Sequence, residues 1–301
     1  MNVPIQGNSF EVAWGIPIAI YFWFTGMSAG SFMISVMATV GGQSQYKALA
    51  KIGGVLAPLL LIAGPLILVW HSAQPFRFWE TIITWNPTSP MSYGAALLTT
   101  YPINCVIYLY FVFKGNQKLA KIFGIAGIPL AVAVHGYTGF ILGMNIDRPV
   151  FGSPITPIYF LISAMVAGLG LLIFVTILLE TLFPKMQRTD PKLLFGLGKY
   201  MAYAIGLDFL LALSEITVLM AEESEAVEAA RQFLVGRFAL MFWGVELFLG
   251  LLVPMLVFYI PKLGMRRSVM FASCGMVLVG NLAMRYLTVV GGQTVPLWPL
   301  S

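Results

Sequence analysis

Residues 12–46 read VAWGIPIAIYFWFTGMSAGSFMISVMATVGGQSQY and contain no charged side chain. An α-helix rises about 1.5 Å per residue, so roughly 20 apolar residues cross the ~30 Å hydrocarbon core of a bilayer. This uncharged stretch predicts a membrane-spanning helix. No basic residue precedes it and Glu11 stands at its entrance, unlike the pattern of a cleaved signal peptide, so we expect the helix to be retained.

The rest of the chain has the composition of a membrane protein. Of its 301 residues, 59% are hydrophobic and 10% are charged, and the mean hydropathy is +0.87. Long continuous apolar runs indicate helices, because barrel strands would alternate in polarity. We therefore predict an all-α integral membrane protein of eight transmembrane helices, in two four-helix groups at 1–150 and 151–301. The predicted spans are 13–40, 53–71, 91–113, 122–145, 155–181, 199–221, 237–260 and 268–290.

Basic residues are distributed unevenly between the predicted loops. Twelve lysines and arginines fall in or beside the first, third, fifth and seventh loops, whereas the opposite side carries Arg77, Arg148, Arg231 and Arg237. The positive-inside rule then predicts a multi-pass inner-membrane protein with cytoplasmic odd-numbered loops and periplasmic termini. The net charge of +5 reflects this orientation, and no basic stripe or nucleic-acid motif points to nucleic acid as a partner.

Few ionisable side chains are predicted at membrane depth, where burial of charge is costly and indicates a function. Asp208 and Glu215 are seven residues apart and share one helix face, while Glu246 and Arg285 lie in the last two spans. Two interpretations are open. Either the carboxylates relay protons, or Glu215, Glu246 and Arg285 form a buried ion pair or triad that fixes the helix packing.

The histidine count argues against a pair of haems in this protein and leaves at most one. Its two histidines are His71, at the end of a span, and His135, near the middle of another. Two bis-histidine haems would need four histidines, so we do not expect electrons to cross the bilayer through this chain. Cys105 and Cys274 both lie inside predicted helices, which supports neither a disulfide framework nor a cysteine metal site.

Two tyrosines lie at matching depths. Tyr21 and Tyr137 are each nine residues from the outer end of their predicted helix, which puts both phenols ~13 Å deep. His135 lies slightly deeper. The two carbonyl oxygens of a quinone need donors and its redox chemistry needs proton acceptors, so this set suits a quinone site; ordinary interior aromatics are the alternative. The aromatic loop 72–90 is either an interfacial belt or the lid of a lipophilic pocket.

Three strings carry a resemblance to a known family. PFRFW at 75–79 leads to NPTSPMSYG at 86–94, YTG at 137–139 runs to NIDRPV at 145–150, and RY at 285–286 precedes GGQ at 291–293. In order and spacing over the whole chain these strings resemble the NrfD/PsrC family, the membrane subunits of polysulfide reductase, nitrite reductase and related complexes. The resemblance implies a periplasmic iron–sulfur partner, usually with a molybdopterin catalytic subunit, quinone or menaquinone as bound substrate near the outer face, and no haem or metal in the chain.

The resemblance also assigns site residues. Tyr137 matches a quinone-site tyrosine of the family, whereas Tyr21 falls where the polysulfide reductase subunit has a histidine. A phenol is a poorer proton acceptor than imidazole, so His135 or His71 is expected to take that role. An asparagine of the relative is replaced by Pro17, and His71 falls near one of its acidic residues. Arg77, Asp147 and Arg148 are expected at the pocket mouth, the docking surface or in loop ion pairs.

Together these inferences predict a membrane-anchor, quinone-interacting subunit of a respiratory oxidoreductase. Its pocket is expected between the first, second and fourth spans under the Arg77 loop, with terminal catalysis in a partner chain. Proton translocation through Asp208, Glu215, Glu246 and Arg285 is a further hypothesis. Two alternatives of another class remain open, an ion-coupled secondary transporter and a non-catalytic structural anchor.

Overall fold

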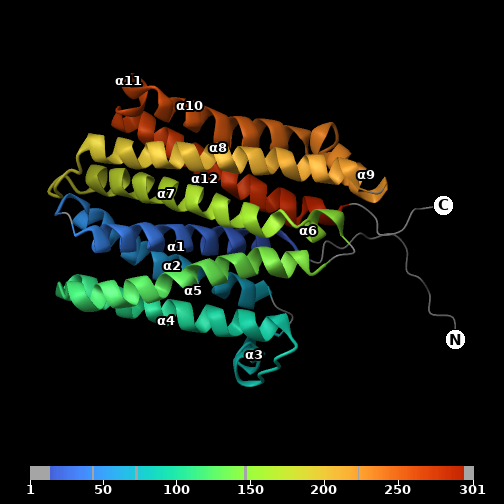
Figure 1. Ribbon diagram of the computed structural model, residues 1–301, viewed down its shortest axis with the longest axis horizontal. Coiled ribbons are helices and arrows are strands. Elements are labelled where there is room, and N and C mark those ends of the chain that lie inside the picture. Colours follow the sequence, from blue (N-terminus) through green and yellow to red (C-terminus); the bar gives the residue numbers. More distant parts are fainter. Residues whose placement is uncertain (1–13, 43, 72–73, 146–147, 223, 295–301) are drawn as a thin grey trace.

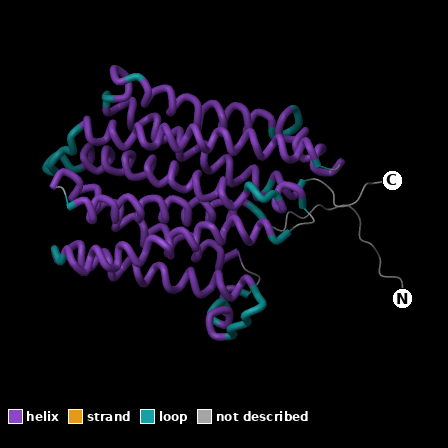
Figure 2. Tube along the Cα trace, viewed as in Figure 1, coloured by secondary structure: helices purple, strands orange, loops and turns teal. Residues whose placement is uncertain are grey.

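The computed structural model describes residues 14–42, 44–71, 74–145, 148–222 and 224–294. Helices dominate this part of the chain, and it contains no strand (Figure 2). Eight of its helical segments are long and apolar enough to cross a membrane. The predicted all-α fold with eight transmembrane helices is therefore confirmed.

The eight spans run side by side as one bundle (Figure 1). They are α1 (Ile16–Gly41), α2 (Lys47–His71), α4 (Pro90–Lys114), α5 (Gln117–Gly143), α7 (Thr156–Leu182), α8 (Pro191–Ala221), η3 (Leu240–Leu252) continued by α10 (Val253–Tyr259), and α12 (Arg267–Val289). The short helices are η1 (Ser44–Tyr46), η2 (Pro75–Arg77), α3 (Glu80–Ile83), α6 (Pro149–Gly152), α9 (Ser224–Leu234), α11 (Pro261–Gly264) and η4 (Gly291–Gln293). Segment η3 is a π-helix, whose backbone hydrogen bonds join residues five apart.

Two spans begin more than five residues earlier than their hydropathy predicts. Helix α2 starts at residue 47 rather than 53, and α8 starts at residue 191 rather than 199. Both extensions contain lysines, which lower the local hydropathy but favour helix and reach water with long side chains. Two other spans, α1 and α4, are capped at their C-terminal ends by Gly42 and Gly115. Glycine readily adopts the left-handed backbone found there (φ 66° and 73°).

Close helix contacts join the first four spans to the last four, and also join two of the last four spans to each other. A methyl group on Gly30 of α1 or Gly168 of α7 would overlap the backbone of the other helix, and Gly250 of η3 meets Gly280 of α12 in the same way. Small residues at such crossings let membrane helices approach closely. The first four spans lie on one side of Figure 1 and the last four on the other; the division into groups 1–150 and 151–301 stays a proposal.

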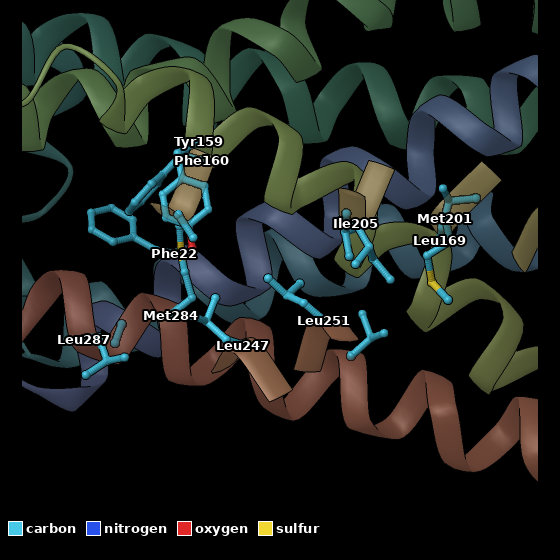
Figure 3. Packing of buried hydrophobic residues seen from close by; sticks show 14 of the residues in the cluster. Phe22, Tyr159, Phe160, Leu169, Met201, Ile205, Leu247, Leu251, Met284 and Leu287 are labelled. Atoms are coloured by element: carbon cyan, nitrogen blue, oxygen red, sulfur yellow. The ribbon is translucent and has the colours of Figure 1, made fainter. Parts of the chain in front are cut away.

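The short helices distinguish the two ends of the bundle. Helices α3, α6 and α9 lie at one end and α11 lies at the other (Figure 1), and we call these the α3/α9 end and the α11 end. Between them, Figure 3 shows Phe22 of α1 beside Tyr159 and Phe160 of α7. The rings of Phe22 and Phe160 meet edge to face with centroids 5.8 Å apart. This packing brings α1 and α7 together next to the polar side chains described below.

Candidate functional site

A groove of about 530 Å³ lies between α4 and α5 at the α3/α9 end. Its volume is in the range of small-molecule sites, and its walls are mostly apolar. Tyr93 donates its hydroxyl hydrogen bond to the Pro87 carbonyl (3.0 Å). Tyr137 is thus the lining phenol whose hydroxyl has no hydrogen-bond partner among the described residues. The groove is lined by Thr88, Pro90, Tyr93, Ala133, Gly136, Tyr137, Phe140 and Met144.

The position of Tyr137 depends on a glycine in the neighbouring span. Its ring and hydroxyl rest directly on Gly94 of α4, where any β-carbon would overlap them. Glycine at 94 therefore leaves room for the tyrosine at the groove wall. Gly94 ends one of the sequence strings singled out above, and this contact supplies a physical reason for glycine there.

Tyr21 lies close to Tyr137 but is not part of the groove lining. It is 4% exposed, its ring stands 5.2 Å from that of Phe22, and a β-carbon on Gly64 of α2 would lie 3.4 Å from its ring. The two tyrosine hydroxyls are within electrostatic range of each other. The structure therefore brings together the two phenols that were predicted to lie at one depth, one in the groove and one buried beside it.

His135 occupies the other side of α5, away from the groove lining. It is fully buried, with Nε2 2.6 Å from the Phe160 carbonyl of α7. A carbonyl only accepts, so Nε2 carries the proton and Nδ1 is left without a partner among the described residues. Arg285 Nη2 lies 3.4 Å from Nε2, and a methyl group on Gly26 would press on the imidazole. The sequence placed His135 with Tyr137 by depth alone.

The predicted mouth residues are spread over the α3/α9 end. Arg77 donates to both carboxylate oxygens of Glu80 (2.7 Å each) in an exposed ion pair, while Arg148 Nη1 donates to the Gln293 carbonyl (3.0 Å). The Arg77 guanidinium holds the pKa of the Glu80 carboxyl below its usual range. His71 is exposed at the end of α2, and Asp147 lies outside the described residues.

Arg285 is the centre of a buried polar cluster among α7, α8, η3 and α12. Its Nη2 donates to Ser163 Oγ (2.6 Å) and to the Phe160 carbonyl (3.1 Å), and its guanidinium lies 3.8 Å from the centroid of the Phe160 ring. Asp208 and Glu246 are buried within electrostatic range of it. Among the described side chains Arg285 forms no ion pair within 4 Å, so the ion-paired triad considered from the sequence is not formed.

Glu246 and Glu215 line a second, smaller cavity of about 40 Å³. Glu246 accepts a hydrogen bond from the Tyr159 hydroxyl (2.5 Å), and Glu215 Oε2 accepts one from Ser153 Oγ (2.8 Å). The other oxygen of Glu215 is buried without a partner in the described part of the chain. The cavity is mostly apolar but has both carboxylates in its wall, and its size leaves room for a water that would join them. Glu215 is thus separated from Arg285, with Glu246 between the cavity and the cluster.

A family match over almost the whole length decides where the protein belongs. The family model described as "Polysulphide reductase, NrfD" matches residues 4–296. The protein belongs to the NrfD family. The resemblance drawn from the three sequence strings is therefore confirmed.

Individual NrfD relatives are similar along most of the chain. A selenate reductase subunit of Mesobacillus selenatarsenatis is 28% identical, over 94% of this chain and 75% of that protein. A polysulfide reductase subunit of Wolinella succinogenes is also 28% identical, over 94% and 95% respectively. The Hdr-like menaquinol oxidoreductase integral membrane subunit of Archaeoglobus fulgidus is 30% identical, over 97% and 74%.

The structure puts the NrfD-type strings around the groove and the buried cluster. The first string begins in η2, its two parts are separated by α3, and it ends at Gly94; the second starts at Tyr137 and the third at Arg285. At the end of the third string, Gln293 Oε1 accepts a hydrogen bond from the Trp14 amide (3.1 Å), and Gln293 Nε2 donates one to the Trp14 carbonyl (2.9 Å). The strings therefore combine groove residues with residues that tie the chain together.

Sequence reasoning missed three partners in this NrfD protein. Tyr159 donates a hydrogen bond to Glu246, and Ser163 accepts one from Arg285. Ser153 donates one to Glu215. Tyr159 and Ser163 are four residues apart on one face of a largely apolar helix, a signal that was available in the sequence. Within the described ranges, no group of three His, Cys, Asp or Glu side chains could hold a metal ion; the absence of haem and metal stays a prediction.

Proposed function

We propose that this NrfD-family protein is the quinone-interacting membrane subunit of a respiratory oxidoreductase, and that the headgroup of a quinone such as menaquinone binds in the groove between α4 and α5. The observation that carries the proposal is an apolar groove of about 530 Å³ in which the Tyr137 hydroxyl has no protein partner among the described residues. The relatives named above are subunits of reductases and of a menaquinol oxidoreductase, which supports the same class.

The residues around the groove suit a quinone. A headgroup carries two carbonyl oxygens that accept hydrogen bonds, and Tyr137 is positioned to donate one. Apolar walls suit the ring and its isoprenoid tail, which pack against them without leaving a polar group of the protein unpaired. Bound quinone supplies the two-electron, two-proton redox chemistry; the protein binds the headgroup and manages the protons. Tyr21, close to Tyr137, is the next hydroxyl for such a proton.

The proposed partners are those that the family resemblance implies, and the reductase subunits among the relatives support them. We propose that electrons pass between the groove and an iron–sulfur subunit docked at the α3/α9 end, with a molybdopterin-containing subunit performing the terminal reaction. This end faces the periplasm in the proposed inner-membrane orientation. Thr88 and Pro90, which lie at this end, line the groove, so the electron path to such a partner would be short.

Binding of a menaquinone analogue to the detergent-purified chain tests the proposal. Tyr137→Phe keeps the ring on Gly94 and removes the hydroxyl, so affinity should fall by about tenfold, the value of one hydrogen bond. Tyr200→Phe, on the lipid-facing side of α8 at 69% exposure, is the control and should bind as the parent does. A parent chain that ignores the analogue would contradict the proposal and favour a transporter or a structural anchor. Co-purified iron–sulfur and molybdopterin subunits would identify the partners.

We further propose that Glu215, Glu246 and Asp208 form a proton route, with Arg285 holding the local charge. The supporting observation is that Glu215 and Glu246 line one small cavity, with an unpartnered carboxylate oxygen on Glu215 among the described residues. In the intact complex reconstituted in liposomes, Glu215→Gln should reduce proton translocation while quinone turnover continues. Unchanged translocation in this variant, or none in the parent, would remove the route.

A further inference from the structure

Hydroxyl groups follow one face of α1 for most of its length. Tyr21, Thr25, Ser28, Ser35 and Thr39 are separated by four, three, seven and four residues, a spacing that keeps them on one stripe of a helix. The first four are buried and Thr39 is half-buried near the α11 end. The eighteen residues from Tyr21 to Thr39 cover ~27 Å along the axis, nearly the full hydrocarbon thickness.

Helix α4 places matching polar groups against this stripe at the α11 end. The Tyr108 hydroxyl lies 2.8 Å from Ser35 Oγ and 2.7 Å from Thr39 Oγ1. Ser35 gives its one proton to the Ala50 carbonyl (2.5 Å), so Tyr108 donates to Ser35 and can accept from Thr39, whose own proton is shared with the Ser35 carbonyl (2.9 Å). Three hydroxyls are thus connected from the α11 end inward.

Two further hydroxyls stand between this connected set and Tyr21 without protein partners. Ser31 Oγ and the Tyr101 hydroxyl are fully buried and unpaired within the described part of the chain. The Tyr101 hydroxyl faces Cys105 and Ser28 without reaching hydrogen-bond geometry with either. Buried hydroxyls are nearly always hydrogen-bonded, and ordered water is the usual partner where protein groups are absent. Packing alone does not account for a tyrosine hydroxyl left unpaired in the core.

Glycines of α2 let this helix approach the hydroxyl groups of α1 closely without filling the space around them. A β-carbon on Gly53 would lie 2.7 Å from the Ser31 carbonyl, and one on Gly54 would lie 3.3 Å from Ser35 Oγ. Larger side chains at these positions would therefore crowd the hydroxyls. The close approach of α2 also shields the stripe from lipid, since Ser28 donates to the Ala57 carbonyl across this contact (2.7 Å).

We propose that these groups form a proton path from the α11 end to Tyr21. We call the set Thr39, Tyr108, Ser35, Ser31, Tyr101, Ser28, Thr25 and Tyr21 the hydroxyl ladder; water bridges it at Ser31 and Tyr101. Its end point rests on the proposed function, because Tyr21 adjoins the quinone groove. The ladder would let the groove exchange protons with the side of the membrane opposite to its opening.

The transfer is balanced at each hydroxyl. A proton that arrives on Thr39 displaces the proton of Thr39 to Tyr108 and that of Tyr108 to Ser35. The displacement continues through the bridging water, Ser31, Tyr101, Ser28 and Thr25 to Tyr21, whose own proton passes to the quinone as it is reduced. Each oxygen of the ladder loses one proton as it gains one, so no net charge stays behind. Ser35, Ser28 and Thr25 each donate to a backbone carbonyl at rest, so the rotation of these three hydroxyls is the expected slow step.

The two cysteines provide a direct test in the purified chain. Cys105 lies beside Tyr101 in the ladder, whereas Cys274 is buried in the apolar core of the last four spans, and both are 0% exposed. Infrared spectroscopy follows the exchange of S–H to S–D after transfer to D₂O, in a spectral region free of other protein bands. Cys105→Ala and Cys274→Ala assign the two bands. The ladder predicts that Cys105 exchanges at least about tenfold faster than Cys274.

Variants separate the ladder from general breathing of the bundle. Tyr108→Phe should slow Cys105 exchange about tenfold, and Ser35→Ala should do the same by a change on a different helix. Tyr110→Phe, two residues away and 51% exposed on the outside of α4, should leave it unchanged. Equal exchange of the two thiols, or Cys105 exchange that ignores both ladder variants, would overturn the proposal.

The same variants distinguish failure of the ladder from failure of the quinone site. Tyr108→Phe should bind the menaquinone analogue with the affinity of the parent, because it lies at the far end of α4 from the groove. If Cys105 exchange depends on the ladder variants but the protein binds no analogue, the proton path is supported and its proposed end at a quinone site is contradicted. If the protein binds the analogue but Cys105 exchange is slow and ignores the ladder variants, the quinone site is supported and the proton path is contradicted.

Discussion

Two arginines of α12 lie on the same side of the helix but differ in how many of their nitrogens have hydrogen-bond or ion-pair partners. Arg267 and Arg285 are eighteen residues apart, five full turns, so both face α7. At the α11 end, Arg267 pairs with Glu180 and also donates to the Thr189 carbonyl, while Glu180 Oε1 accepts from the Thr189 amide (2.6 Å). Deeper in the bundle, Arg285 Nε and Nη1 have no partner among the described residues, and neither has Asp208 Oδ1.

The difference indicates what each site is for. The Arg267 site holds the loop between α7 and α8 against α12. Its two opposite charges pair with each other, as in a structural ion pair. The Arg285 cluster keeps buried donors and acceptors uncommitted, which costs stability and is characteristic of functional sites. Stability should therefore depend mainly on the first site and proton chemistry mainly on the second.

The largest effect on stability should come from breaking the closed pair. Arg267→Gln leaves Glu180, which is 2% exposed, without its cation, and should lower the free energy of unfolding by about 3 kcal/mol. Thermal unfolding in detergent measures the change. The neighbouring exposed arginine gives a matched control, since Arg266→Gln should alter the midpoint little. Equal shifts of the unfolding midpoint in both variants would mean that the ion pair with Glu180 adds no stability.

A smaller loss of stability is expected at the other arginine. Arg285→Gln removes hydrogen bonds to Ser163 and the Phe160 carbonyl, but also removes two buried donors that are unpaired among the described residues, so the net cost should be about 1–2 kcal/mol. The same unfolding measurement applies, with proton translocation by the intact complex as the second readout. A loss of stability larger than that of Arg267→Gln would reverse the comparison.

Removing one donor within the cluster should cost less again. Tyr159→Phe keeps the packed ring and deprives Glu246 of its hydrogen bond, which should lower stability by about 1 kcal/mol. The expected functional change is altered proton translocation, measured in proteoliposomes, with analogue binding at the groove preserved. Unaltered translocation would show that Glu246 works without Tyr159 or is not on the route.

The smallest effect should appear at the exposed pair of Arg77 and Glu80. The pKa of Glu80 is lowered by its hydrogen bonds to Arg77, so the pair is fully present above the usual glutamate pKa and is lost as the pH falls through the lowered value. The tryptophan emission of the α3 loop, compared between the parent and Glu80→Gln, should differ at neutral pH and converge in acid. Global unfolding should not change measurably, because both side chains are largely in water. Spectra that differ equally at every pH would contradict the titration.

The sequence was most informative about depth along each helix. Spacing placed Tyr21 and Tyr137 at one level, and the structure brings the two phenols within electrostatic range. The same argument failed to resolve rotation about the helix. His135 is two residues from Tyr137, about 200° around α5, and therefore faces α7 instead of the groove. The groove itself lies between the third and fourth spans, because α4 carries Gly94 against Tyr137, rather than between the first, second and fourth.

Partners within the buried cluster were beyond sequence reasoning for a related reason. The membrane positions of Glu215, Glu246 and Arg285 were correctly predicted as lying within helices, yet which of them touch depends on how α8, η3 and α12 pack. The π-helical turns of η3 change the register of Glu246 relative to an α-helix, and no residue pattern in 240–252 announces them. Hydrogen-bond partners such as Ser153 and Tyr159 then follow from that packing.

The π-helix gives the seventh span an unusual sensitivity to length. In η3 both Glu246 and Gly250 face inward, toward Tyr159 and toward Gly280 of α12. A return of the segment to ordinary α-helical winding at unchanged length would turn one of the two relative to the other by about 70°, because each of the four steps between them would advance about 100° instead of roughly 82°. Either the carboxylate would leave the core or the close crossing with α12 would fail. Deletion of one residue between them would nearly cancel this turn, because three steps of about 100° would replace four of roughly 82°. The length of this span therefore determines which helical winding keeps both residues facing inward.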